Sequence, residues 1–421
     1  MNRNAFEWTL GLPPPRLQSH SAAKHRLIKN YLERYFNTVT VVGMDQLQIS
    51  LIDGFCGGGV FENSEGEKVP GTPMIMLQSV KDAEAQINQK LQKKITINAK
   101  YYFIDKSESA INYLKNEIQD TEFAHQVIDT SIHLRNGKFE EEYEKIIKDI
   151  LSRAPAGRSI FLLDQCGYGQ VPLLICRNIL RLLPKSEIIL TFAIDWLVDH
   201  ASLKQEFLKS VQSLGLLEAQ IKKFLETKDN RNYRYLTQRF LAKHLQHETG
   251  VPFFTPFFLH SEEAHRNLWV IHLSKHPTAR NVMVSCHWEI QNSSIHQGEA
   301  GLNMLGFGPN WENQPPLDFM FDKNAENLTM EALRKDIPYR IEKLSGRRAI
   351  SIDDFLYKTV NDTPARYDQI VDALQYLHGE KDIEIWTPSS REKKPNAQLK
   401  GKDRIRRHIR QSLLPIFKKQ K

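Results

Sequence analysis

The segment Leu51–Gly59, which reads LIDGFCGGG, constrains the fold more than any other part of the chain. An apolar strand that runs into an acidic residue and then into a cluster of glycines is typical of the first turn of a nucleotide-binding α/β domain. Glycines at such a turn let a ligand approach the backbone, although tight turns also use them for purely conformational reasons. The segment therefore favours an α/β domain if the rest of the chain supplies matching strands.

Two further apolar runs end in a carboxylate and are followed by helical periodicity, at Tyr101–Asp105 and Ile160–Asp164. In an open parallel sheet the carboxyl ends of the strands meet at one edge, where ligands bind. We therefore expect Asp53, Asp105 and Asp164 to gather at that edge. Each acid taken alone is about as consistent with capping the next helix, but three in the same position favour a site.

The glycine cluster excludes two common nucleotide sites. A phosphate-binding P-loop needs a Lys and a Ser or Thr after its last glycine, whereas this chain continues Val60-Phe61-Glu62-Asn63. The glycines are also contiguous, unlike the spaced glycines of a dinucleotide fold. An acidic loop suits a cationic ligand such as S-adenosylmethionine, with Asp53 near its ammonium and sulfonium and Asp105 accepting its ribose hydroxyls.

Several segments, in this order, carry a resemblance to a known family: His20–His25, Leu51–Gly59, Pro70–Pro73, Phe103–Lys106, Leu163–Pro172, and His276–Met283 with Trp288. They resemble the three-Cys-motif partner protein (TcmP) family, whose core is similar to class I S-adenosylmethionine-dependent methyltransferases. The resemblance implies a Rossmann-like doubly wound sheet and an S-adenosylmethionine site. That site would comprise Asp53, Phe55, Gly57, Gly59 and Asp105.

The third family motif usually reads Asp-Pro-Phe-Gly, and related amino-methyltransferases of nucleic acids carry Asp-Pro-Pro-Tyr. Here Gln165 and Cys166 replace the proline and the aromatic residue, while Asp164 and Tyr168 remain. We expect Asp164 to orient the methyl acceptor and Tyr168 to serve as a stacking platform or secondary acid/base. The alternative is that Asp164 only caps a helix over 171–183.

A helix over Arg26–Phe36 is predicted by an apolar stripe at helical spacing, and we expect residues 1–45 to form a helical cover over the cofactor. In the family such a helix lies at the cofactor mouth, so Lys24 is expected to contact cofactor or nucleic-acid phosphate. The alternative is that Lys24 belongs to a solvated polar face.

Positive charge is concentrated at the carboxyl end. The chain has a net charge of +7, yet residues 391–421 hold twelve basic and two acidic side chains, so the preceding part is slightly acidic. Helices over 350–357 and 364–377, a strand over Ile383–Trp386 and a polar hairpin predict a winged helix-turn-helix at 346–421, ending in a helix over 403–417. The residues expected to bind nucleic-acid phosphates are Lys393, Lys394, Arg404, Arg406, Arg407 and Arg410.

The remaining organisation follows from composition. We expect a Rossmann-like domain over 46–300 with a helical insertion at about 200–250, then a linker over 301–345 that is rich in Gly, Asn and Pro at its start. No apolar run approaches membrane length and the start lacks a signal-peptide core, so a cytoplasmic location is expected. The four cysteines show no paired short spacing, so no metal site is predicted.

The function indicated is that of an S-adenosylmethionine-dependent nucleic-acid methyltransferase. Resemblance implies a partner with a three-cysteine motif and a role in bacterial anti-phage defence. The alternative is a non-catalytic adaptor that binds nucleic acid with a degenerate methyltransferase fold, which the departures at Gln165 and Cys166 favour. The sequence leaves open DNA or RNA, the modified atom, the oligomeric state and the partner's identity.

Overall fold

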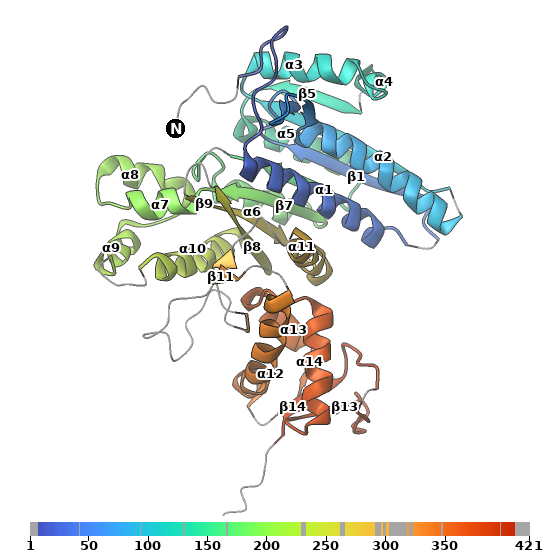
Figure 1. Cartoon of the computed structure of the whole chain (residues 1–421), viewed down its shortest axis with the longest axis vertical. Coiled ribbons are helices and arrows are strands. Elements are labelled where there is room, and N and C mark those ends of the chain that lie inside the picture. The colour runs from blue at the N-terminus through green and yellow to red at the C-terminus, as the bar shows by residue number, and fades with distance from the viewer. Residues whose placement is uncertain are drawn as a thin grey trace, which may run out of the picture. The chain divides into compact units, whose positions relative to one another are not determined.

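The computed structural model describes residues 7–41, 43–92, 94–128, 131–165, 167–228, 233–261, 266–290, 296–297, 300–302, 318–319, 323–346, 348–395 and 397–408. The chain divides into two compact units. Unit 1 contains the elements from α1 to β11, and unit 2 contains the elements from α12 to β14 (Figure 1).

A seven-stranded sheet forms the centre of unit 1, in the order β5-β4-β1-β6-β7-β9-β8. Its strands are β1 (Gln46–Asp53), β4 (Thr96–Asp105), β5 (Ile132–Asn136), β6 (Ser159–Leu163), β7 (Ser186–Phe192), β8 (Phe253–Ser261) and β9 (Arg266–Ser274). The first five strands of this order are parallel, and β9 runs antiparallel to both of its neighbours. The predicted Rossmann-like α/β sheet is therefore confirmed.

The central strands are apolar because both of their faces are covered. Every residue of β6 and of β7 is buried, as are residues 49–53 of β1. Near-continuous apolar runs of this kind are typical of parallel strands between two helical layers. The predicted strand ends at Asp53 and Asp105 are confirmed, and β6 ends one residue before Asp164.

Helices cover both faces of the sheet. They are α1 (Ser19–Val39), α2 (Thr72–Leu91), α3 (Glu108–Gln119), α4 (Ala124–Ile128), α5 (Phe139–Arg153), α6 (Leu173–Leu182), α7 (Ile194–His200) and α11 (Pro277–Ile290). The helices α1 and α2 lie side by side in front of the strands in Figure 1, and α1 also packs against α11. A short hairpin of β2 (Val60–Glu62) and β3 (Lys68–Pro70) precedes α2.

A buried polar cluster fixes α1 on the sheet. The Tyr31 hydroxyl donates to Glu187 on β7 and lies 3.1 Å from Nε2 of His272 on β9. His272 Nε2 is also 2.9 Å from a carboxylate oxygen of Glu187. Burying these polar groups costs free energy unless they bond one another, so the cluster specifies where α1 sits.

Helices also occupy the range expected for an insertion, namely α8 (Gln205–Ser210), η1 (Gln212–Leu214), α9 (Glu218–Glu226) and α10 (Tyr233–Thr249). The short strands β10 (His296–Gln297) and β11 (Asp318–Phe319) pair with each other. Within the described ranges, no helix is long and apolar enough to cross a membrane.

Unit 2 is a small helical unit with a three-stranded sheet. Its elements are α12 (Lys323–Ser345), β12 (Ile350–Ser351), α13 (Ile352–Thr359), η2 (Val360–Asp362), α14 (Tyr367–Gly379), β13 (Ile383–Trp386) and β14 (Arg404–Arg407). The sheet order is β12-β14-β13, with both pairs antiparallel. The strand predicted over Ile383–Trp386 is confirmed.

Two sequence expectations are corrected in unit 2. The segment 301–345, expected to be a linker, contains α12, which buries Leu333, Ile337 and Ile341 against α14 and β14. The helix expected over 403–417 does not begin there, because Arg404–Arg407 pairs with β13 as β14. The rest of that predicted helix lies outside the described residues.

Candidate functional site

The three strand-end aspartates lie at one edge of the sheet. Strand β1 lies between β4 and β6, with Asp53 in register with Phe103 and Leu162. Asp105 ends β4, and Asp164 directly follows β6. The chain connections leave β1 and β6 in opposite directions along the sheet, which makes this the topological switch point where ligands of such folds bind. We call this position the carboxyl edge.

Asp53 is fully buried at the centre of the carboxyl edge. Its carboxylate accepts hydrogen bonds from the Thr72 hydroxyl and from the Phe55 N–H, the latter at 3.1 Å. Burial raises the pKa of Asp53 to about 7, because desolvation and the charges of Asp164 and Asp105 outweigh these hydrogen bonds. Asp53 is therefore a carboxylate whose charge changes near neutral pH.

Asp105 organises the glycine loop. One of its carboxylate oxygens accepts the Gly57 N–H at 3.0 Å, and the other accepts the Ser107 N–H at 2.8 Å. Gly57 and Gly59 have φ angles of 57° and 79°, which L-residues with side chains rarely adopt. The loop shape thus depends on both the glycines and Asp105.

The glycine loop contacts a residue that the sequence did not indicate. A Cβ atom on Gly57 or Gly58 would lie 2.6 or 2.1 Å from the indole of Trp8. That indole is buried and donates from Nε1 to the Val60 carbonyl oxygen at 2.8 Å. The contiguous glycines therefore accommodate an indole from the N-terminal segment, in addition to any ligand that the loop binds.

Trp8 and Gly58 are expected to be energetically coupled. Because Gly58 does not have a positive φ angle, Gly58→Ala should destabilise the protein only through its clash with the indole, by about 1–3 kcal/mol. In a Trp8→Ala background, which itself costs roughly 3–5 kcal/mol, the same change should cost under about 1 kcal/mol. Denaturant unfolding of the four proteins measures this coupling, and an equal cost of Gly58→Ala in both backgrounds would contradict it.

Asp164 forms an ion pair with Lys24, which α1 brings to the carboxyl edge. The Lys24 side chain is only 10% exposed and that of Asp164 is 32% exposed. Burial favours a higher pKa for Asp164, but the charge and hydrogen bond of Lys24, with a further bond from Thr191, hold that pKa below its usual value. Asp164 is therefore ionised at neutral pH.

This pairing corrects two alternatives. Lys24 does not lie on a solvated polar face, since its ammonium bonds the site carboxylate. Asp164 does not cap the helix that follows, because α6 begins after Pro172 and has no side-chain cap. Both residues instead lie together at the carboxyl edge.

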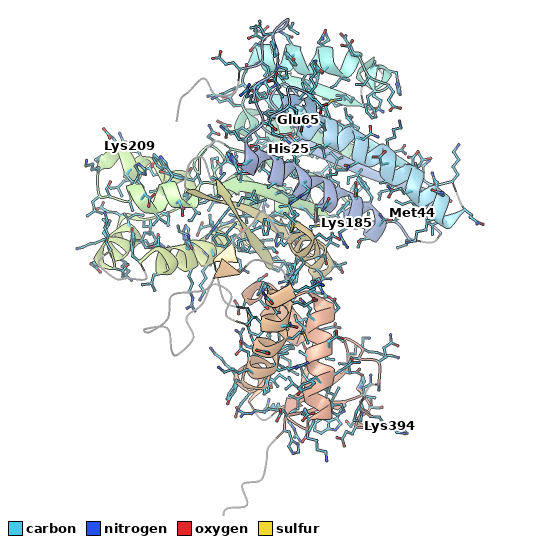
Figure 2. The ribbon with its side chains drawn as sticks, in the orientation of Figure 1. His25, Met44, Glu65, Lys185, Lys209 and Lys394 are labelled. Atoms are coloured by element: carbon cyan, nitrogen blue, oxygen red, sulfur yellow. The ribbon has the colours of Figure 1, made fainter. Side chains whose placement is uncertain are left out.

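His25, which follows Lys24 directly, is buried as well. Burial and the Lys24 charge lower its pKa to about 3, so the imidazole is neutral at physiological pH. Its Nδ1 is buried without a hydrogen-bond partner among the described residues, and its ring packs against Phe61. Figure 2 labels His25 in the amino-terminal half of α1.

The side chain of Gln165 holds together the loop that follows Asp164. Its side-chain oxygen accepts the N–H groups of Gln170 and Val171, each at 2.9 Å. Its Nε2 is buried, and it has no partner in the part of the chain that the structure describes. Gln165 thus stabilises the loop after Asp164 and leaves one unused donor beside it, while Cys166 lies outside the described residues.

Tyr168 is buried in the core of unit 1, not exposed as a stacking platform. It is 5% exposed, its ring packs against Phe192 and Trp196, and its hydroxyl lies 2.8 Å from Oγ of Ser210. Burial raises its pKa. A ring held in this way packs the insertion against β7 and offers no free face in this conformation.

The residues predicted to bind nucleic acid differ in their surroundings. Lys393, Arg406 and Arg407 pair with Asp403, Glu384 and Glu342, whereas Lys394 and Arg404 are exposed. Arg410 lies outside the described residues. The described residues contain no group of three or more His, Cys, Asp or Glu side chains placed to hold a metal ion.

No family model and no curated protein matches the chain. Among solved structures, it is similar to the plantazolicin methyltransferase BamL in complex with a triazolic desmethylPZN analog and SAH, with 13% identity over 61% of this chain and 86% of that chain and a TM-score of 0.25. It is also similar to a protein described as a sarcosine dimethylglycine methyltransferase from Galdieria sulphuraria, with 12% identity over 59% and 84% and a TM-score of 0.23. At such TM-scores the similarity supports no conclusion, so the assignment of the fold depends on the strand order alone.

Proposed function

We propose that unit 1 binds S-adenosylmethionine at the carboxyl edge and that the protein methylates nucleic acid. The observation that carries this proposal is the placement of Asp53, Asp105 and Asp164 at the ends of three adjacent parallel strands. Strand β9, which lies between β7 and β8 and is antiparallel to both, distinguishes this sheet from the all-parallel sheet of the dinucleotide-binding fold. Three carboxylates at a switch point suit a cation better than a pyrophosphate.

The residues at the carboxyl edge fit this cofactor. Asp53 would attract its ammonium and sulfonium, Asp105 would accept its ribose hydroxyls, and the backbone of Phe55, Gly57 and Gly59 would line its approach. The buried, unpartnered Nε2 of Gln165 and Nδ1 of His25 are polar atoms that a bound ligand would satisfy. When bound, the cofactor supplies an electrophilic methyl group.

Asp164 is the proposed acceptor-orienting group. Its ionised carboxylate can accept a hydrogen bond from the nucleophile when the Lys24 ammonium moves off the carboxylate oxygen that it bonds. The positive charge of Lys24 would still lie close enough to balance that of the carboxylate. Holding the nucleophile in line supplies most of the acceleration in such a transfer. His25, neutral and next to the pair, is placed to accept a hydrogen bond from the same ligand.

The nucleic-acid substrate is proposed from unit 2. The order of its helices, strands and basic loop supports the proposal of a winged helix, and its exposed lysines and arginines suit phosphates. A three-cysteine-motif partner protein and a role in anti-phage defence are proposed from the family resemblance alone.

Mass spectrometry of nucleosides from cells with and without this gene tests the proposal, whichever nucleoside is the substrate. A methylated nucleoside that depends on the gene supports an enzyme. The second candidate is a non-catalytic adaptor, which the replacement of the prolyl turn by Gln165 and the Lys24–Asp164 ion pair favour. Cofactor binding without any gene-dependent methylated nucleoside would support the adaptor.

Cofactor affinity should depend on pH through Asp53. Its pKa is about 7, and only the ionised form attracts the cationic ligand, so affinity should fall about tenfold per pH unit as the pH drops below 7. Calorimetric titrations from pH 5.5 to 8.5 measure this. An Asp53→Asn variant should lose this dependence and keep only the part due to the ligand's own amine. An unchanged profile in that variant would contradict the role of Asp53.

A further inference from the structure

The basic residues of unit 2 fall into two classes that the sequence does not separate. The first class forms ion pairs inside the unit: Lys393 with Asp403, Arg406 with Glu384, and Arg407 with Glu342. Arg406 also stacks on Trp386 and Arg407 on Tyr339. The other class is exposed and has no side-chain partner among the described residues: Arg391, Lys394, Lys400, Lys402 and Arg404. Four of these five lie in residues 387–403, which we call the β13–β14 loop.

The β13–β14 loop is built around a buried carboxylate. Asp403 is 1% exposed and accepts hydrogen bonds from the Lys393 ammonium and, at 2.7 Å, from the Lys400 N–H. The Lys393 ammonium also donates to the Gln398 carbonyl oxygen. The ion pair therefore joins the middle of the loop to its carboxyl end, and a carboxylate as deeply buried as that of Asp403 is stable only with such a partner.

The helices of unit 2 also hold this loop. His378 on α14 lies 2.7 Å from the Lys393 carbonyl oxygen, so its ring nitrogen donates there. On the other side, the Asp353 N–H donates to the Gly401 carbonyl oxygen at 2.8 Å. The exposed cations are thus carried on an ordered loop, which lowers the entropy lost when they bind a ligand.

Helix α14 is unsuited to entering a nucleic-acid groove. Its thirteen residues include no lysine or arginine. Asp368 and Asp372 are exposed on it, and only Asp368 has an ion-pair partner among the described residues, namely Arg366. A helix inserted between phosphate backbones would bring these carboxylates close to like charge, which is unfavourable.

We infer that unit 2 binds the phosphate backbone of nucleic acid through the β13–β14 loop and Arg404, and that α14 stays outside the groove. This inference rests on the proposed nucleic-acid function and names the contacts that would serve it. Lys394, which Figure 2 labels at the outer edge of unit 2, is one of these contacts. Binding of this kind is strongly salt-dependent and insensitive to sequence.

The test is fluorescence anisotropy of the full chain with labelled duplex DNA, single-stranded DNA and RNA of random sequence between 50 and about 200 mM salt. The loop variant is Lys394→Gln/Lys400→Gln/Lys402→Gln. The matched control is Lys335→Gln/Lys343→Gln/Lys358→Gln, which removes three exposed lysines from α12 and α13 of the same unit.

The loop variant should bind about 10- to 100-fold more weakly at low salt and reduce the salt slope by about 2–3, whereas the control should stay within about threefold. An Asp372→Ala change on α14 should leave affinity within about twofold or improve it slightly. Equal losses in loop variant and control, or no binding by the wild type, would overturn the inference. Titrating the same variants with S-adenosylmethionine measures cofactor binding by unit 1 independently. The absence of a cofactor site is therefore distinguishable from the absence of nucleic-acid binding by the loop.

Discussion

An Asp164→Ala variant is expected to lose nucleic-acid methylation by about a thousandfold while its affinity for S-adenosylmethionine changes only a few-fold. Lys24 lies against this carboxylate and holds its pKa below the usual value, so the group is ionised and ready to accept a hydrogen bond. Removing it deletes the group that orients the acceptor but leaves Asp53 and Asp105 in place. Mass spectrometry of methylated nucleosides from expressing cells and calorimetry with the cofactor give the two readouts.

Loss of an ion pair could itself lower activity by destabilising the fold, and the chain offers a matched control for this. Lys100 and Asp149 form an ion pair at 2.8 Å whose side chains are 18% and 36% exposed, similar to those of Lys24 and Asp164. Lys100 lies five residues before the end of β4, roughly 16 Å along the strand from the carboxyl edge. Asp149→Ala should therefore lower stability without abolishing methylation. Equal activity losses in both variants would contradict a specific role for Asp164.

An Asp105→Ala variant is expected to weaken S-adenosylmethionine binding by about a hundredfold. Two effects combine: the Gly57 and Ser107 N–H groups lose their acceptor, and the cofactor loses the group proposed to bind its ribose. A hydrogen bond to a charged group contributes about 1.5–3 kcal/mol, which corresponds to roughly 10- to 150-fold in affinity. Isothermal titration calorimetry measures this change.

A cofactor analogue without ribose hydroxyls separates the two effects. Wild-type protein should bind the analogue more weakly than S-adenosylmethionine, and Asp105→Ala should bind both about equally. If the variant still discriminates between them as strongly as the wild type, Asp105 only supports the loop and the proposed ribose contact is wrong.

The sheet and its edge were predictable because they depend on local patterns. Apolar runs that end in Asp53, Asp105 or Asp164 identify strands, and parallel topology places their ends together. The buried stripe of α1 was equally readable from its helical spacing. Helix α12 was missed although Ala325, Thr329, Leu333, Ile337 and Ile341 recur at every fourth position, because the Gly-, Asn- and Pro-rich segment that precedes it indicated a linker.

Long-range contacts at the site were not predictable in the same way. Lys24 and Asp164 are separated by 140 residues, and Trp8 and Val60 by 52. Nothing in a local pattern indicates that the glycine loop packs against an indole, or that Gln165 holds its loop through two backbone N–H groups. These contacts depend on where α1 and the N-terminal segment lie on the finished sheet.

A crystal structure of the full chain grown with S-adenosylhomocysteine tests the proposed cofactor site most directly. We expect the ligand at the ends of β4, β1 and β6, with its ribose hydroxyls within hydrogen-bonding distance of Asp105 and its amino group on the side of Asp53. A ligand bound elsewhere on the chain, or no ligand at the carboxyl edge at millimolar concentration, would contradict a cofactor site formed by the three aspartates.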